Sequence, residues 1–175
     1  VEALDLVIKS PEGKVLAGPL NFALPAGARV VLVGQSGSGK SSLLNTLLGF
    51  LPYEGSLMVN GVELRELDAE RWRRLLSWVG QNPQLPAATL RENVLLAWPE
   101  ASEAQLRLAL DKAWVSEFIA LLPQGIHTAV GDQAGRLSVG QAQRIAVARA
   151  LLVPCRLLLL DEPAASLDAH SEQRV

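Results

Sequence analysis

The 175-residue sequence contains one cysteine, two histidines and no long apolar run. One cysteine excludes an internal disulfide framework and is typical of a reducing compartment. No segment reaches the about 18 apolar residues of a transmembrane helix, and no charged-then-apolar leader opens the sequence, so we expect no membrane-spanning segment in it. The net charge of −2 lacks the basic excess of a broad nucleic-acid-binding surface. These absences indicate a chain of cytosolic character, with no nucleic acid among its partners, that can still dock onto a membrane partner.

The remaining composition is that of a globular domain. Hydrophobic residues make up 49% and charged residues 19% of the chain, which is ordinary for a folded protein and excludes disorder. The length fits one domain, large enough to bury about 70% of its unfolded surface. No internal repeat or low-complexity segment interrupts it.

Local signals predict strands at both ends of the chain and helices between them. Asn60-Gly61 predicts a hairpin turn, and the four leucines of residues 157–160 predict a strand buried on both faces, with a buried helical segment as the alternative. N-cap residues mark three helix starts. The predicted helices are Asp68 through Leu76, Ser102 followed by Glu103 to Trp114, and Gln141 to Leu152.

The most informative motif is a complete G-x-x-x-x-G-K-S phosphate loop at residues 34–41. It reads Gly34-Gln35-Ser36-Gly37-Ser38-Gly39-Lys40-Ser41. Residues 29–33 before it predict a strand and residues 42–48 after it predict a helix, so backbone N–H groups from the loop through Ser42 can surround phosphate oxygens at the helix start. Lys40 would reach the outer phosphates and the Ser41 hydroxyl would hold magnesium. The motif predicts a binding site for a nucleoside triphosphate.

An acidic pair follows the predicted leucine strand. Asp161 would lie at the carboxyl end of that strand, where open α/β sheets place their ligands, and could hold magnesium. Glu162 would point to the other side of the strand and could orient or deprotonate the water that attacks the γ-phosphate. The alternative is a solvated turn before Pro163.

A second phosphate-directed helix start is predicted at residues 137–144, which we call the signature segment. Ser138 is a natural N-cap, and Gly140 allows a ligand to approach closely. Backbone N–H groups at such a start attract phosphate. Taken alone, a segment of this kind is more often the start of an ordinary capped helix.

Together these motifs resemble the ATP-binding domain of ABC transporters, and the resemblance covers nearly the whole chain. The motifs that carry it are, in order, the phosphate loop, Gln81 in Val79-Gly80-Gln81-Asn82-Pro83, the Leu-Ser-x-Gly-Gln signature, Leu160-Asp161-Glu162-Pro163 and Ser166-Leu167-Asp168. The resemblance implies two such domains that sandwich ATP head to tail. Ser138, Gly140 and Gln141 would then contact nucleotide held by the partner, and Asp168 would bridge the two subunits. Gln81 would touch magnesium and the attacking water; its alternative is a plain surface glutamine.

Finer features resemble exporters. Residues 89–94 and 128–135 are similar to exporter segments, and residues 78–89 and 161–170 resemble bacterial heterodimeric exporters of the CydDC type, which are associated with cysteine and glutathione export and with cytochrome bd assembly. Val139 replaces a glycine usual in the signature, and no aromatic residue lies near Ile8 or Lys9 to stack on adenine. His127 and His170 do not match the family's switch histidine. The resemblance implies a C-terminally truncated piece of a longer polypeptide whose transmembrane domains lie outside it.

We therefore expect an α/β fold: a P-loop NTPase core with an antiparallel β edge and a helical insertion, the ABC ATPase fold. The expected parts are residues 1–82 as core with β subdomain, 83–150 as helical subdomain and 151–175 as incomplete core. The expected function is MgATP binding and hydrolysis for a thiol exporter at the cytoplasmic face of the bacterial inner membrane, with a second ATP-binding subunit as partner. Alternatives are a regulatory half-site with little hydrolysis, and an exporter of another cargo such as lipid or drug. A DNA-repair ATPase would carry a long insertion between Gln81 and Ser138, which is absent.

Overall fold

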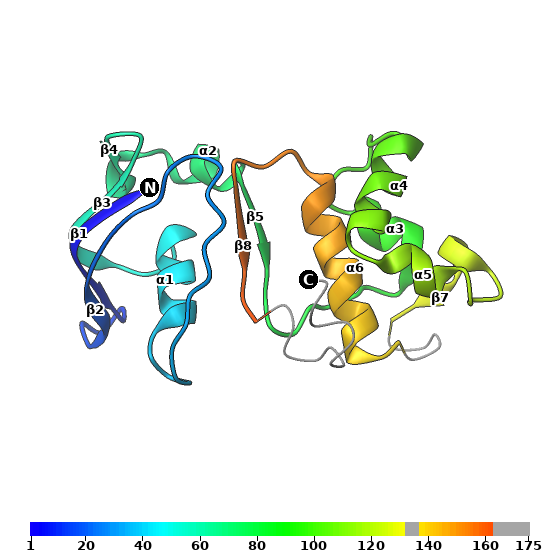
Figure 1. Ribbon diagram of the computed structural model, residues 1–175, viewed down its shortest axis with the longest axis horizontal. Coiled ribbons are helices and arrows are strands. Elements are labelled where there is room, and N and C mark those ends of the chain that lie inside the picture. Colours follow the sequence, from blue (N-terminus) through cyan, green and yellow to red (C-terminus); the bar gives the residue numbers. More distant parts are fainter. Residues whose placement is uncertain (132–136, 163–175) are drawn as a thin grey trace. The chain divides into compact units, whose positions relative to one another are not determined.

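The computed structural model describes residues 1–131 and 137–162, which fall in two compact units (Figure 1). The first unit, Val1–Leu76, contains β1 (Glu2–Lys9), β2 (Val15–Ala23), α1 (Lys40–Leu47), β3 (Tyr53–Val59), β4 (Val62–Glu63), the 3₁₀ turn η1 (Leu64–Glu66) and α2 (Ala69–Arg73). The second, from Ser77, contains most of β5 (Leu76–Val79), then β6 (Ala88–Thr89), α3 (Leu90–Leu95), α4 (Glu103–Lys112), α5 (Val115–Ile119), η2 (Gly125–His127), β7 (Ala129–Val130), α6 (Val139–Leu152) and β8 (Leu157–Leu160). No helix in these ranges is long and apolar enough to cross a bilayer.

The first unit is built on an antiparallel sheet with strand order β2-β1-β3-β4. Its buried face includes Leu6, Ile8 and Leu57, which are fully buried; removing each such side chain from water contributes about 1.5–3 kcal/mol. β3 and β4 are joined by Asn60 and Gly61, both with positive φ (51° and 78°), as a two-residue hairpin turn requires. The predicted antiparallel edge and its turn are confirmed.

Helix α1 buries one apolar face and is tied to α2 at its C-terminal end. Leu43, Leu44 and Leu47 are buried, and the indole N–H of Trp72 donates to the carbonyl of Leu47 at 2.6 Å. This bond satisfies a carbonyl that the last turn of α1 leaves without a helical partner. Asp68 caps α2 as predicted, since its side chain accepts from the N–H of Arg71.

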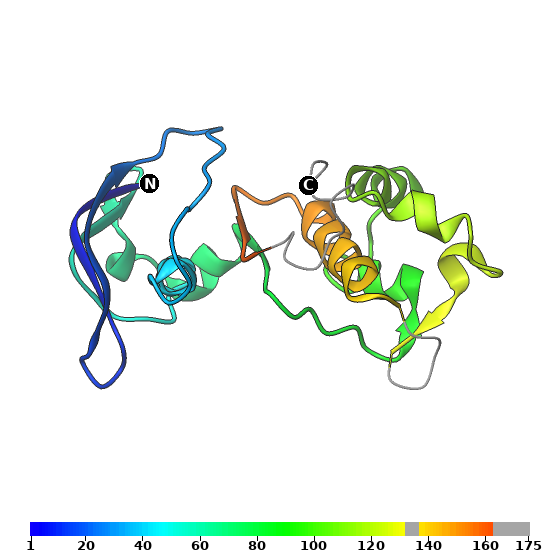
Figure 2. The same cartoon turned by 60° about the horizontal axis from the view of Figure 1, so that its bottom comes forward.

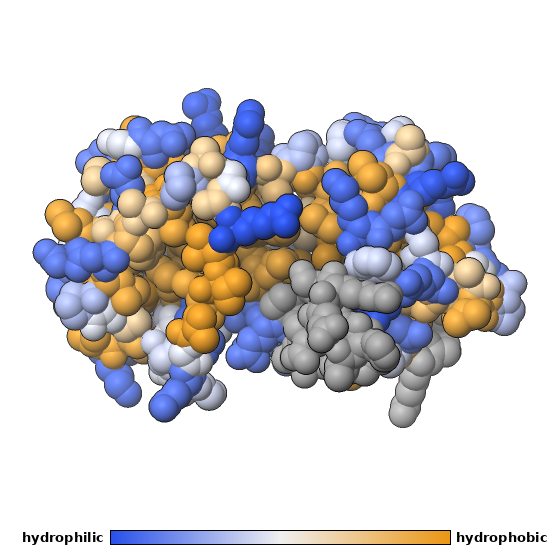
Figure 3. All heavy atoms as spheres, in the orientation of Figure 1, coloured by the Kyte–Doolittle hydropathy of each residue, from blue (hydrophilic) through white to orange (hydrophobic). Residues whose placement is uncertain are grey.

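The predicted strand at residues 29–33 is wrong. Within the parts of the chain that the structure describes, these residues have no regular structure and pair with no strand. Val31 and Val33 are 83% and 91% exposed, and hydrophobic surface is visible over this segment in Figure 3. A strand exists only through hydrogen bonds to a neighbour. An apolar composition therefore predicts the capacity to pair but not the pairing itself.

In the second unit, α6 lies between the β5–β8 pair and helices α3 to α5 (Figures 1 and 2). Ala146 and Ala150 pack with Val79, whereas other residues of α6 join a larger cluster with α3, α4 and α5. That second set includes Ile145, Ala148 and Leu152. Residues 157–160 form a strand, as predicted, and not a buried helix.

Two helices end earlier than predicted. α4 starts after Ser102 as predicted but ends at Lys112, because Trp114 adopts a left-handed conformation (φ 56°) that a helix cannot continue through. α2 ends at Arg73 and not Leu76, because Leu76 already begins β5.

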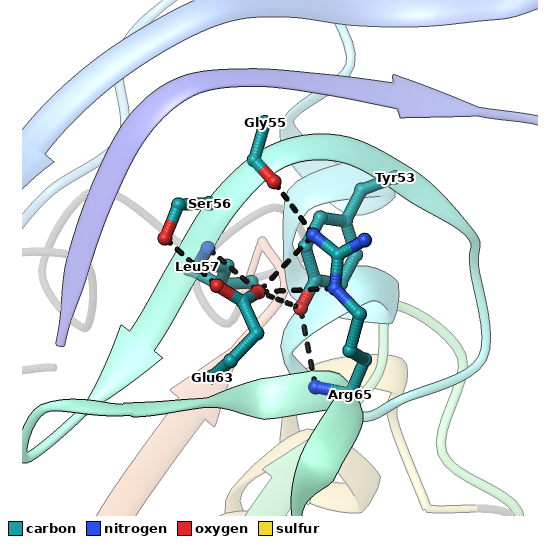
Figure 4. A network of polar contacts seen from close by, with 6 residues as sticks. All are labelled: Tyr53, Gly55, Ser56, Leu57, Glu63 and Arg65. Carbon is teal, nitrogen blue, oxygen red and sulfur yellow. Dashed lines mark hydrogen bonds and ion pairs between the residues drawn. The ribbon is translucent and has the colours of Figure 1, made fainter.

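A polar network fixes the β3–β4 hairpin around Glu63 (Figure 4). Its carboxylate accepts hydrogen bonds from the Tyr53 hydroxyl at 2.6 Å, the Ser56 hydroxyl at 2.8 Å and the Leu57 N–H at 3.1 Å. Arg65 donates to the same carboxylate and stacks 4.5 Å from the centre of the Tyr53 ring. Burial alone would raise the pKa of Glu63, but these hydrogen bonds outweigh it and lower the pKa to about 2. Burial, reinforced by the Glu63 carboxylate, raises the pKa of Tyr53 to about 12.

The lowered pKa of Glu63 predicts acid sensitivity of the fold. The ordinary pKa is 4.5 and the folded value is about 2, so the stabilisation is fully present above pH 4.5 and is lost as the pH falls toward 2. We expect the advantage of wild type over Glu63→Gln to shrink by about 2 kcal/mol between pH 7 and pH 3, measured by urea unfolding. Glu100→Gln, at an exposed position, is the control. A difference independent of pH would contradict the assignment.

Candidate functional site

The phosphate loop ends where α1 begins. The N-cap of α1 is Gly39, with φ 90°, and a Cβ at this position would lie 2.5 Å from the Cβ of Ala17. Positive φ and close approach to β2 therefore both require glycine. Helices α3, α4 and α6 begin with side-chain capping boxes, but α1 has no side-chain cap. An anion can take the position of the missing side-chain oxygen.

Lys40 folds back over the loop that precedes it. Its Nζ donates to the carbonyl oxygens of Gly34 at 2.8 Å and Gln35 at 3.0 Å. The same carbonyl of Gln35 accepts from the N–H of Ser38 at 3.2 Å. Hydrogen bonds between an ammonium and a phosphate are charge-assisted at both ends and stronger than those to neutral carbonyls. Lys40 is thus placed to exchange these carbonyls for phosphate oxygens.

Strands β5 and β8 bring Gln81, Asp161 and Glu162 to one end of their small sheet. The two strands are hydrogen-bonded neighbours and run in the same direction (Figure 1). The N–H of Asp161 donates to the carbonyl of Val79 at 2.9 Å, extending the pairing beyond β8. Gln81 is two residues beyond β5, and the acidic pair follows β8 directly. The predicted place of Asp161 at the carboxyl end of its strand is therefore observed.

Glu162 departs from extended geometry immediately after the strand. Its φ is +49°, a left-handed conformation that costs a residue with a side chain of order 1–3 kcal/mol. The residue is exposed, whereas Asp161 is half-buried. Strain of this kind persists only where the surrounding structure imposes it, and it is frequent at functional sites.

The signature segment forms the predicted helix start. The Ser138 hydroxyl oxygen accepts from the Gln141 N–H at 3.1 Å, and the Gln141 side-chain oxygen accepts from the Ser138 N–H at 2.9 Å. This capping box holds both side chains at the exposed end of α6. Because Ser138 uses its hydroxyl as acceptor, the hydroxyl proton can still be donated to a phosphate oxygen. Val139, in the first turn, is 58% exposed.

The predicted site residues lie in both units. The first unit holds the phosphate loop and Ser42, and the second holds Gln81, the signature segment and the acidic pair. Asp168 lies outside the described residues. Among the described residues, no group of three or more His, Cys, Asp or Glu is arranged to hold a metal. The donors predicted for magnesium, from Ser41, Gln81 and Asp161, are all oxygens, which is the ligand type that this cation takes.

Sequence reasoning missed three polar residues that contact the chain around Gln81. Gln143 and Arg149 of α6 and Asn93 of α3 donate hydrogen bonds to backbone carbonyls between Gly80 and Thr89. Gln143 and Asn93 are almost fully buried. The signal in the sequence was a polar residue on a helix face otherwise occupied by alanine, valine and leucine.

Comparison with known proteins identifies the family of the chain. A model of the ABC transporter family matches residues 17–165. Over its whole length the chain is 77% identical to the glutathione/L-cysteine transport system ATP-binding/permease protein CydD of Escherichia coli K12, and the match covers 30% of that protein. It is 61% identical, again over its whole length and 30% of the other protein, to the transport ATP-binding protein AarD of Providencia stuartii. It therefore spans about 30% of the length of these relatives. A bacterial Atm1-family ABC exporter solved with ATP bound superposes with a TM-score of 0.88 at 33% identity, over 99% of this chain and 30% of that one. The chain belongs to the ABC transporter family and has its ATPase-domain fold.

Proposed function

We propose that this chain binds MgATP and hydrolyses it to drive a membrane exporter of cysteine and glutathione. The observation that carries the proposal is the start of α1, where a glycine N-cap without a side-chain oxygen meets the complete phosphate loop and Lys40. The cargo is proposed because a relative that is 77% identical to this chain is named for glutathione and L-cysteine transport.

The proposed roles follow the chemistry of each group. Lys40 and the loop amides neutralise the phosphates, and Ser41, Gln81 and Asp161 supply oxygen ligands to Mg²⁺. Glu162 accepts a proton from the attacking water, which Gln81 helps to orient. Bound magnesium would neutralise part of the phosphate charge.

The remaining predicted site residues are proposed to act between two subunits. The exposed start of α6 presents Ser138, Gly140 and Gln141 to nucleotide on a second ATP-binding subunit, and Asp168 contacts that subunit. We place this pair on the cytoplasmic face of the bacterial inner membrane, joined to transmembrane domains of the same polypeptides.

A regulatory half-site with little hydrolysis is the second candidate. Val139 favours it, because an exposed β-branched side chain stands in the first turn of α6, where the family usually has glycine. Its bulk can hinder phosphate from reaching the N–H groups of that turn. Under this reading the site that the chain completes for its partner is the weaker one.

Substitution of Glu162 tests the proposed hydrolysis. In the full-length protein assembled with its partner subunit, we expect Glu162→Gln to keep ATP affinity within about twofold and to reduce turnover at least about 100-fold, because the amide cannot accept the water's proton. ATPase rates are measured with and without cysteine and glutathione, with Glu100→Gln as the matched control.

The outcomes separate the candidates. Thiol-stimulated turnover that the mutation abolishes supports the proposed exporter. An ATPase rate that Glu162→Gln does not change supports the regulatory half-site. Turnover indifferent to thiols leaves the ATPase and rejects this cargo in favour of another, such as lipid or drug.

Nucleotide binding can be tested on the 175-residue chain itself. MgATP at 100 times its dissociation constant should stabilise the folded chain by about 2.7 kcal/mol, read as a shift in thermal unfolding. Lys40→Met should remove most of that shift, because the uncharged side chain cannot pair with phosphate. Repeating the titration with EDTA measures the magnesium contribution. An unshifted wild type would contradict ATP binding by this chain.

A further inference from the structure

The segment that carries Gln81 has no regular structure of its own. Residues 80–87, which we call the Gln81 segment, connect β5 to β6 without helix or strand. Such a segment depends on other groups to satisfy its carbonyls and to define its path. Three side chains of the second unit do this, two of them from α6.

Gln143 holds the start of the segment. It is 3% exposed, and its Nε2 donates to the carbonyl of Gly80, the residue before Gln81, at 3.3 Å. Its Oε1 has no hydrogen-bond partner among the described residues. A glutamine with one orphaned atom is a poor way to fill a core, since a leucine of similar size would bring no polar atom that needs a partner. The contact with Gly80 is what distinguishes glutamine from leucine here.

Arg149 and Asn93 hold the other end. Arg149 donates from Nε to the Asn93 carbonyl at 2.8 Å, from Nη2 to the Asn93 side-chain oxygen at 3.1 Å and from Nη1 to the Gln84 carbonyl at 3.4 Å. Asn93 in turn donates from Nδ2 to the carbonyls of Pro86 at 3.0 Å and Thr89 at 3.1 Å. These partners are neutral oxygens, and burial lowers the pKa of the Arg149 guanidinium. The planar fork of arginine directs donors from three separate nitrogens at these acceptors, a geometry that the single nitrogen of lysine does not reproduce.

The two anchors belong to the same rigid element as the signature segment. α6 runs from Val139 to Leu152 and packs on both of its sides. Gln143 lies five residues from Ser138 and Arg149 six residues further, or about 8 Å and 9 Å along the axis. A displacement of the start of α6 is therefore carried to both ends of the Gln81 segment.

We propose that Gln143 and Arg149 are positioning residues, which set the place of Gln81 relative to α6 and couple contacts at Ser138 to the Gln81 side chain. The inference rests on the proposed function, in which Gln81 touches magnesium and the attacking water. Neither residue contacts the reacting atoms. Both act through the path of the backbone on either side of Gln81.

The test uses the full-length transporter with its partner subunit, reconstituted in nanodiscs. Gln143→Leu and Arg149→Met should each lower kcat for ATP about 10-fold, because small displacements of a catalytic group cost this much or more, while KM for ATP stays within about twofold. Gln143→Leu should leave the melting temperature unchanged, since it also removes the orphaned oxygen. Arg149→Lys should fall between Arg149→Met and wild type. Arg74→Met, which breaks an exposed ion pair with Glu70, is the matched control.

The decisive measurement repeats Gln143→Leu in a Gln81→Ala background. If Gln143 acts by placing Gln81, the double variant should turn over at the rate of Gln81→Ala alone. A further 10-fold loss would overturn the inference, as would wild-type kcat in the single variants or a loss confined to KM. A wild-type transporter that hydrolyses no ATP would overturn the proposed function and this inference with it, and that result is distinct from the others.

Discussion

The burial of α6 on two sides is the interaction on which the second unit depends. Alanines at 146 and 150 allow the helix to approach the strand pair, while the opposite side fills the cluster made with α3, α4 and α5. A helix held this way has little freedom to move without its neighbours, because a close-packed interior transmits displacement. Ser138 at its start and the anchors Gln143 and Arg149 are consequently displaced together when the helix moves.

Sequence reasoning succeeded where the determining interactions are local. The caps at Asp68, Ser102 and Ser138 and the Asn60-Gly61 turn are each decided by contacts within a few residues, and all four are observed. The four-leucine strand was predictable because a short run bounded by a proline-containing turn and an acidic pair is too brief for a helix. The phosphate loop was predictable because its chemistry is contiguous.

Most of the failures are non-local. Residues 29–33 have the composition of a strand, but pairing depends on a neighbouring strand that composition cannot identify. Trp114 ended α4 early through a backbone conformation that aromatic residues seldom adopt. The contacts of Gln143 and Arg149 join positions 56 to 65 residues apart. No local sequence pattern on either side of such a contact predicts it.

The two carbonyls that hold Lys40 have a consequence for how nucleotide reaches the site. They are dipoles and not counter-ions, so they orient the ammonium without cancelling its charge. Lys40, half-buried behind the exposed loop, thus keeps a local positive charge on an otherwise slightly acidic chain. An approaching polyanion feels that charge over roughly 8 Å at physiological ionic strength. Capture is therefore sensitive to salt before any specific contact forms, and the lysine gives up only its bonds to the carbonyls when the phosphate arrives.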